Sequence, residues 1–563
     1  MTESSAGNAA GDLDPVDYAV ISQALLSAAR EMGVKLIRSS YSNIIREAQD
    51  GSAALFDPEG NVVAQAELIP MQLGPMSDIF RACAAVVPPS ALKPGDFYIN
   101  NDPFQGGQHL QDVFIYSPIF VEGRLVGFAG SVTHHLDLGG GNPGLTPDAT
   151  DVHAEGLLFP PSVWNVDRDW NGGNLEKMIA ANVRAPDQTI GDFYAQFASN
   201  AIGAERVAQL CRRYGADRVG ATMIELVGYS ERRFRAAVAA VPDGVYEGED
   251  AVDDDGLSDT PLRVKARVTI RGDEVSVDYS GTDPQVRRNL NCPFASTISA
   301  TLAAVKSALS SPDIPFNEGV KRPIRVTAPE GCLVNPTYPA PVRARMLSAY
   351  RCFDAVLKAL AQAAPDRVVA GGNDSTHSLA FSHLSDGRYR VYLEIYGGGF
   401  GASPRVDGCD GVDSALSNCT NTPVEATDMD FAHIRVVGYG LVPDSGGAGR
   451  RRGGLGLFRS VEALKDGVNF ACYSDRMRLA PFGLFGGEDG ARTRIELRRG
   501  EEVVALPTKT QVTLNKGDVL TIYTAGGGGY GLAEDRPGSM IADDIRQGFV
   551  SEPAARAAYG RVD

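Results

Sequence analysis

The sequence predicts a large α+β protein of several subdomains, with mixed or antiparallel sheets, a central helical region and a glycine-rich, strand-dominated C-terminal part. Three observations support this fold class. The 563 residues exceed what a single compact core accommodates. Helical and strand-like patterns come in blocks, whereas a doubly wound sheet would alternate them regularly. The 63 glycines and 33 prolines indicate many loops and close backbone approaches.

The N-terminal third is expected to combine one helix with β-hairpins. Residues 1–13 are predicted to form a disordered leader. A helix then begins with Asp14 as N-cap and Pro15 at the first helical position, followed by apolar residues at a period near 3.6. The stretch SAALFDPEGNVVAQ reads as one hairpin, and DVFIYSPIFVEGRLVGFAGSV as a second that turns at Glu122–Gly123. Residues 14–172 are therefore predicted to be one helix plus a β-rich region.

Three further regions follow along the chain. Residues 173–245 are rich in Ala, Arg and Leu and are predicted to be helical. Residues 246–365 mix strands such as RVKARVTI with helices near 297–311 and 343–363. Residues 366–563 are predicted to be glycine-rich and β-dominated.

Composition excludes several classes of function. The net charge of −17 and the lack of a long basic stripe argue against nucleic-acid binding. No run approaches 18 apolar residues, so no membrane span is expected. The first residues have neither the basic nor the apolar part of a signal peptide, and we expect a cytoplasmic protein.

Histidine is concentrated in one part of the chain. Four of the seven histidines, at 109, 134, 135 and 153, fall in a 45-residue window that also holds several carboxylates. Imidazole and carboxylate groups together are typical ligands of zinc or manganese. His109 and Asp112 lie on a loop that enters a strand, and alternation should turn one of His134 and His135 toward a site. Asp50 offers a further carboxylate. The alternative is that these residues are only the polar edge of tight loops.

Other catalytic motifs are missing. No G-x-x-x-x-G-K-[ST] segment occurs, and AGGGGYG is not followed by the first turn of a Rossmann helix. We interpret the glycine runs as tight turns and expect any ATP site in another subunit. No G-x-S-x-G is present. Arg343, Arg345 and Arg351 are interpreted either as a site for an anionic intermediate or as a solvated or carboxylate-paired face.

Taken together, these segments resemble the hydantoinase B/oxoprolinase family from about residue 14 to 561. The similar segments include NDPFQGGQHLQDVF, THHLDLGG, HAEGLLFPP, VDYSGT, NTPVEATD and GAGRRRGGLG, in the same order. Two departures leave the substrate open: REAQDGS keeps Asp50 but changes its neighbours, and Asp428 stands where the family usually has Glu.

The resemblance implies a B-type subunit that works with an ATP-binding A-type subunit. The partner, which binds ATP and Mg²⁺, would phosphorylate the carbonyl oxygen of a cyclic amide or ketone. The expected assembly is a hetero-oligomer such as α2β2. It further implies a divalent metal, Zn²⁺ or Mn²⁺ with Fe²⁺ as a third choice, held by Asp50, His109, Asp112 and His134, with His135 as the alternative ligand.

The activity expected from this resemblance is ATP-dependent hydrolysis of a hydantoin, 5-oxoproline or another lactam. The metal would acidify a water, with His135 or Asp137 as general base. One alternative is a subunit of an ATP-dependent ketone carboxylase that uses bicarbonate. The other is a non-catalytic scaffold with a structural metal.

Overall fold

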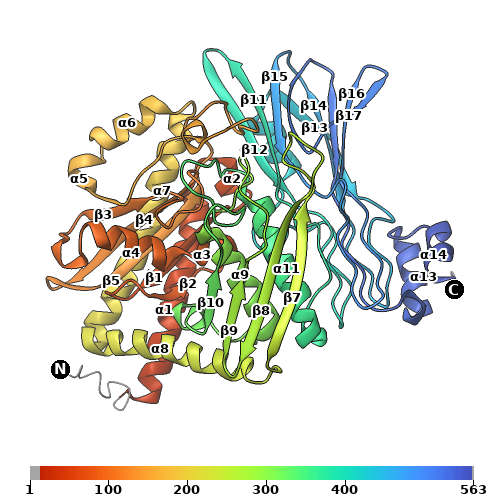
Figure 1. The fold of residues 1–563 in the computed structure, drawn as a ribbon. Coiled ribbons are helices and arrows are strands. Elements are labelled where there is room, and N and C mark those ends of the chain that lie inside the picture. Colours follow the sequence, from red (N-terminus) through yellow and green to blue (C-terminus); the bar gives the residue numbers. More distant parts are fainter. Residues whose placement is uncertain (1–12, 561–563) are drawn as a thin grey trace.

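The computed structural model describes residues 13–560, which fold into four β-sheets and the helices that cover them (Figure 1). The predicted α+β class is confirmed, since helices and mostly antiparallel sheets occur in blocks along the chain. Residues 1–12 of the predicted leader lie outside the described residues.

The first sheet carries both predicted hairpins. Its six strands are antiparallel, in the order β2-β1-β5-β4-β3-β6. The second hairpin turns at Glu122 and Gly123, both with positive φ, and its register shifts by one residue between Ile119 and Phe120. The strands are β1 (Gly51–Phe56), β2 (Val62–Gln65), β3 (Asp96–Asn100), β4 (Asp112–Val121), β5 (Arg124–His134) and β6 (Ser162–Asn165).

Helices cover both faces of this sheet. The long helices α1 (Pro15–Ser39), α7 (Pro186–Tyr214) and α8 (Ala216–Val238) pack on one face, and α4 (Met76–Val86) on the other. As predicted, α1 starts at Asp14, whose carboxylate accepts the Val16 N–H at 3.1 Å. The shorter helices of this part are α2 (Asn43–Arg46), α3 (Pro70–Leu73), α5 (Val166–Asp169) and α6 (Asn174–Asn182).

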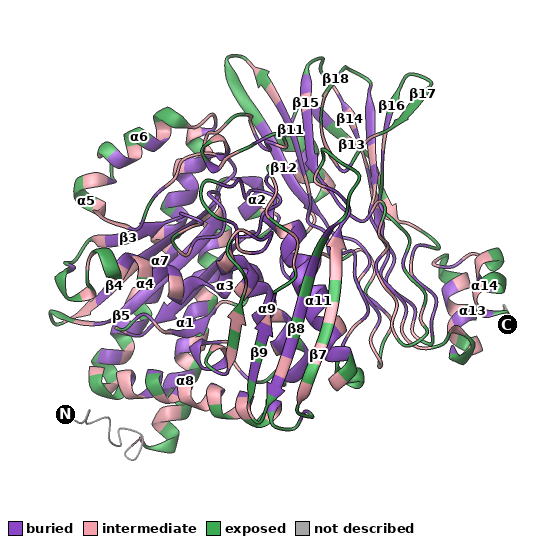
Figure 2. Ribbon diagram, in the orientation of Figure 1, coloured by how far each residue is buried: buried purple, intermediate pink, exposed green. Residues whose placement is uncertain are grey.

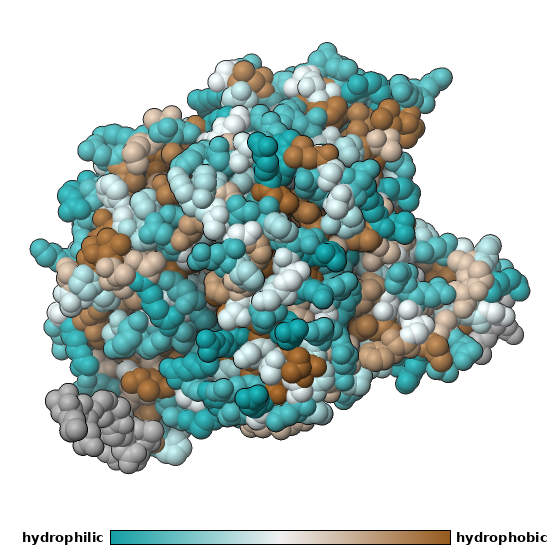
Figure 3. Space-filling model, in the orientation of Figure 1, coloured by the Kyte–Doolittle hydropathy of each residue, from teal (hydrophilic) through white to brown (hydrophobic). Residues whose placement is uncertain are grey.

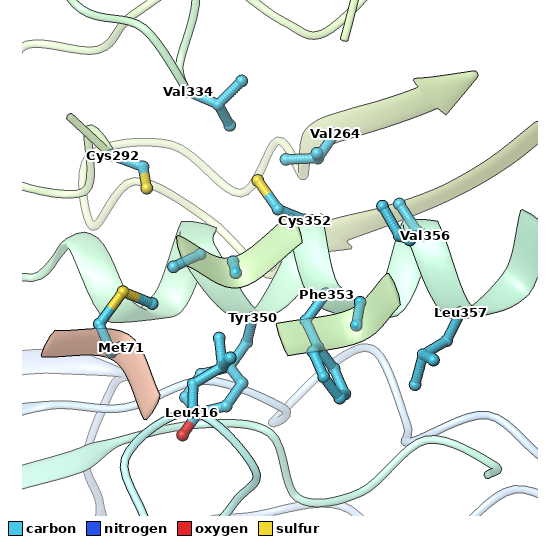
Figure 4. Close-up of a cluster of buried hydrophobic side chains, with 14 of the residues drawn as sticks. Met71, Val264, Cys292, Val334, Tyr350, Cys352, Phe353, Val356, Leu357 and Leu416 are labelled. Carbon is cyan, nitrogen blue, oxygen red and sulfur yellow. The ribbon is translucent and has the colours of Figure 1, made fainter. Parts of the chain in front are cut away.

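The second sheet packs against a largely buried helix. Its order is β10-β9-β8-β7, and only β9 and β10 are parallel. Helix α11 (Arg345–Ala363) packs between this sheet and α9 (Phe294–Leu309), and side chains on several of its faces are buried (Figures 2 and 4). The remaining elements are β7 (Gly244–Val252), β8 (Leu262–Arg271), β9 (Glu274–Asp278), β10 (Ile324–Thr327) and α10 (Glu318–Lys321).

The third and fourth sheets form a sandwich in the C-terminal part. Their orders are β12-β11-β15-β18 and β13-β14-β19-β16-β17, and one apolar core that includes Phe381, Phe470 and Leu520 lies between them. The strands are β11 (His377–Ser385), β12 (Arg388–Tyr396), β13 (Ile434–Leu441), β14 (Leu457–Ala463), β15 (Val468–Tyr473), β16 (Arg494–Arg499), β17 (Glu502–Ala505), β18 (Lys509–Leu514) and β19 (Val519–Tyr523). The helices are α12 (Val424–Asp430), α13 (Gly538–Gln547) and α14 (Glu552–Tyr559).

Glycine-rich segments run side by side between the sandwich and α13 and α14 (Figure 1). We call segments 397–408, 446–456, 483–490 and 526–531 the glycine bundle. Their backbones hydrogen-bond to one another: the Gly454 N–H donates to Phe400 O and the Gly527 N–H to Gly454 O, both at 2.8 Å. A methyl group on Gly399 would overlap the carbonyl oxygen of Gly454.

The bundle corrects our interpretation of the glycine runs as tight turns. Gly399, Gly454 and Gly527 do not have the positive φ that turns demand of glycine. They are needed because neighbouring backbones approach too closely for any side chain.

The surface gives no sign of a membrane-spanning segment. Among the described residues, no helix is both long and apolar enough to cross a bilayer. On the face in Figure 3, hydrophilic and hydrophobic residues are intermixed.

Candidate metal centre

Strand pairing in the first sheet brings four predicted ligands to one place. Asp112 opens β4 and His134 closes β5, and the register makes them direct partners. Asp50 immediately precedes β1, which pairs with β5 so that Gly51 lies opposite Thr133. His109 enters from the loop before β4. The ends of three neighbouring strands therefore meet where these four side chains lie.

The donor atoms of this cluster are at distances that suit a single ion. His109 Nδ1 lies 3.2 Å from one carboxylate oxygen of Asp112. His134 Nδ1 lies 3.8 Å from the other oxygen of Asp112 and 3.8 Å from an oxygen of Asp50. One donor atom each from His109, Asp112 and His134 all fall within 4.8 Å of one another. Two imidazoles and two carboxylates form a donor set typical of zinc, manganese or non-haem iron.

The protonation states fit a cation. Burial lowers the pKa of His109 to about 4, with Arg345 adding to the effect, and burial also lowers the pKa of His134. Both imidazoles are thus neutral near pH 7, the form that binds metals. Burial and the charge of Asp112 raise the pKa of Asp50 well above its ordinary value. Two buried carboxylates repel each other here, and a divalent ion between them would relieve that repulsion.

Two residues from outside the hairpins hold the carboxylates. The Gln72 side-chain amide donates to Asp50 at 2.8 Å and to Asp112 at 3.3 Å. The Arg345 guanidinium pairs with the other oxygen of Asp112. Burial alone would raise the pKa of Asp112, but His109 and Arg345 hold it below its usual range. The sequence gives no local signal for Gln72, because its contact depends on the packing of α3 against the first sheet.

His135 faces away from the cluster, as strand alternation requires when His134 faces it. Its Nε2 lies 3.0 Å from the side-chain oxygen of Gln196 and 3.1 Å from the Thr133 hydroxyl. Its ring stacks on Phe193 with centroids 4.2 Å apart. This placement makes His134 the candidate ligand and removes His135 both as the alternative ligand and as a base for water in the cluster.

Asp137 also lies outside the cluster. Its carboxylate accepts the backbone N–H groups of Gly139, Arg184 and Ala185, the last at 2.9 Å. These bonds fix the chain where α7 begins. Because its oxygens are occupied there, the expectation that Asp137 acts as general base has no geometric support.

The cluster lines a partly enclosed cavity of about 50 Å³, room for a few water molecules. Its polar end carries the four candidate ligands with Arg343 and Arg345. The rest of the wall is largely apolar and comes from several distant regions of the chain. The apolar residues include Ile69, Met71, Leu145, Met346, Leu393 and Ile395.

The Hydantoinase B/oxoprolinase family model matches residues 14–533. The chain belongs to the hydantoinase B/oxoprolinase family. A curated family relative, the putative B-type subunit of a D-/L-hydantoinase from Pseudomonas sp. (strain NS671), is 35% identical over 97% of this chain and 95% of its own.

Two solved structures share the fold of this hydantoinase B/oxoprolinase chain. The crystal structure of ATP-dependent caprolactamase from Pseudomonas jessenii superposes with a TM-score of 0.90 at 30% identity, covering 98% of this chain and 97% of the other. A nucleotide-free structure of acetone carboxylase gives 0.88 at 19% identity, covering 97% and 79%. The second likeness establishes the fold alone.

Proposed function

We propose that this chain is the B-type subunit of an ATP-dependent cyclic-amide hydrolase. The observation that carries the proposal is the convergence of Asp50, His109, Asp112 and His134 on one partly enclosed cavity in a hydantoinase B/oxoprolinase family member. Relatives named as a hydantoinase and a caprolactamase support cyclic amides as the substrate class.

The proposal divides the reaction between two chains. An A-type partner binds ATP and transfers its γ-phosphoryl group to the carbonyl oxygen of the ring amide. This chain, whose sequence has no phosphate-binding loop, receives the resulting imidate phosphate. Water adds to the imidate carbon, the ring C–N bond breaks with the proton going to nitrogen, and a second water releases inorganic phosphate. The two chains form a hetero-oligomer such as α2β2.

Each residue of the cluster has a defined part. Asp50, His109, Asp112 and His134 would hold a divalent transition-metal ion, which when bound supplies Lewis-acid activation of water. Gln72 and Arg345 keep the carboxylates in place, and the largely apolar cavity wall limits the water that reaches the imidate. His135 and Asp137 take no part as proton acceptors in this proposal, because both lie outside the cluster.

The test is co-expression with an A-type partner, followed by metal analysis and substrate screening. ATP-dependent ring opening of a hydantoin, 5-oxoproline or lactam, lost after chelation and restored by Zn²⁺ or Mn²⁺, is the expected result. Full activity without any transition metal would overturn the metal assignment.

The same assay separates the alternatives. Turnover of a ketone only with bicarbonate would assign a carboxylase. A His109→Ala complex with undiminished activity would assign a scaffold role to this chain.

A further inference from the structure

Two arginines flank the start of α11 and face the cavity of the metal cluster. Arg343 and Arg345 are 6% and 4% exposed, and both line the cavity together with His109 and His134. Figure 4 shows how deeply the following turns of α11 are buried. Two cations are therefore held in a partly enclosed space.

The donors of these arginines are only partly used. Arg345 pairs with Asp112, but among residues 13–560 no carboxylate oxygen lies within 4.0 Å of the Arg343 guanidinium. Arg343 instead donates to the carbonyl oxygens of Gly144 and Glu155, which are neutral. The Nε of each arginine is buried without a hydrogen-bond partner. A buried guanidinium without a counter-ion is costly, and it indicates that an anion binds there.

The helix itself adds positive potential at the same place. Helix α11 has 19 residues, and no side chain caps its first turn, where Ala344 is the N-cap. The positive end of the helix dipole therefore lies at the cavity wall formed by Ala344, Arg345 and Met346. The Arg345 N–H itself donates to Val342 O and the Leu347 N–H to Ala344 O, so the helix contributes mainly through its dipole.

The charges in the cavity do not balance once a metal is present. Among the charged side chains that line the cavity, the two guanidiniums offset the carboxylates of Asp50 and Asp112. A divalent ion would leave about two positive charges in excess. A phosphoryl dianion matches that excess, and its several oxygens suit donors that arrive from different directions.

We propose that Arg343, Arg345 and the first turn of α11 form an oxyanion subsite that holds the phosphoryl group of the activated substrate beside the metal cluster. This assignment rests on the proposed function, in which the substrate arrives phosphorylated. The subsite fixes the phosphoryl oxygens at the helix start, so that the imidate carbon faces the cluster. After ring opening, the same donors retain inorganic phosphate until the cavity opens.

Phosphate binding to the purified, metal-loaded chain tests the subsite without partner or ATP. We compare the affinities for inorganic phosphate, bicarbonate and 5-oxoproline by calorimetry at constant ionic strength. The variants are Arg343→Gln, Arg343→Lys and, as a control, Arg206→Gln at an exposed ion pair with Glu31. Metal content and far-UV circular dichroism are recorded for each.

We expect wild type and Arg206→Gln to bind phosphate equally, Arg343→Gln at least about tenfold more weakly, and Arg343→Lys between them. Metal content should not change in the Arg343 variants. Equal phosphate affinity in Arg343→Gln and wild type would overturn the subsite, as would no phosphate binding by the metal-loaded chain. Preference for bicarbonate or the 5-oxoproline carboxylate over phosphate would overturn the phosphoryl assignment.

If Arg343→Gln does not fold, the phosphate affinity of Arg343→Lys is the test. An affinity of Arg343→Lys equal to that of wild type would then overturn the proposal. Failure of ring opening in the two-chain assay leaves this binding result intact. The subsite and the proposed function therefore fail independently.

Discussion

The metal cluster and the glycine bundle are opposite solutions to the problem of bringing distant parts of a chain together. In the cluster, strand register places reactive side chains of Asp50, His109, Asp112 and His134 within a few ångströms. In the bundle, the lack of side chains lets backbones hydrogen-bond directly, as Gly454 does with Phe400. One region of the chain therefore depends on the chemistry of its side chains and the other on close backbone packing. Substitutions in the cluster should lower metal binding and activity, whereas substitutions in the bundle should lower stability.

The largest effect is expected in the glycine bundle. Gly454→Ala would force a methyl group onto the Cys409 carbonyl, and we expect it to lower the free energy of unfolding by about 3 kcal/mol or more. Gly220→Ala is the matched control, because Gly220 lies in α8 with open space around it. It should raise stability by about 0.5–1 kcal/mol. Urea unfolding measures both, and equal stabilities would refute the packing argument.

Loss of a ligand should act on function and leave the fold in place. His134→Ala removes one imidazole from the cluster. We expect bound metal to fall from about one ion per chain to near zero, and ring opening by the complex to fall at least about 100-fold. Metal analysis and urea unfolding of the metal-free chain check this. A large loss of stability in the metal-free variant would break the comparison with the bundle.

A smaller effect on metal affinity is expected from a residue that hydrogen-bonds to the ligands. Gln72→Ala removes the amide that bridges Asp50 and Asp112, and metal affinity should fall by about 10- to 100-fold. Gln105→Ala is the control, since Gln105 bonds to Asp102 in the loop before His109. Competition with a chelator gives both affinities. Unchanged affinity in Gln72→Ala would show that the bridge does not tune the site.

A further effect, on stability at low pH, is expected from buried histidines near the metal cluster and in the C-terminal part. Burial lowers the pKa of His109, His135 and His433 to about 4 and that of His377 to about 3. Below pH 6.5 these histidines become protonated in the unfolded chain but stay neutral in the folded chain. The free energy of unfolding is therefore unaffected by these histidines above about pH 6.5. Below that pH it declines by about 1.4 kcal/mol per pH unit for each histidine, down to about pH 4.

The measurement is urea unfolding of the metal-free chain between pH 7.5 and 4.5. His433→Gln should reduce the slope by about 1.4 kcal/mol per pH unit, with the exposed His153→Gln as control. A flat stability profile between pH 6.5 and 4.5 would contradict the prediction.

Local signals in the sequence predicted the framework of the site. The Asp14 cap and the turn at Glu122–Gly123 lie where expected, and the α+β class is confirmed. Asp50, His109, Asp112 and His134 lie together, as a metal site would require, because strand alternation and hairpin pairing can be read locally.

What could not be predicted depends on packing between distant segments. Gln72 reaches Asp112 only because α3 packs against the first sheet, and Arg345 reaches it from α11, more than two hundred residues later. Asp137 has the carboxylate expected of a general base, but that carboxylate accepts the backbone N–H of Ala185 just before α7. The close approach of other backbone segments to the glycine runs cannot be read from the sequence, which therefore predicts only turns there.

The irregularity between Ile119 and Phe120 has a consequence for how this family can vary. Adding or removing one residue in a strand turns its side chains to the opposite face. The extra residue on β5 near the hairpin turn therefore sets the phase in which His134 meets Asp112 at the far end of the two strands. Length changes should be rare in this hairpin, because they would move His134 out of register with Asp112. The number of residues between Asp112 and His134 is therefore as much a requirement of the site as the two side chains themselves.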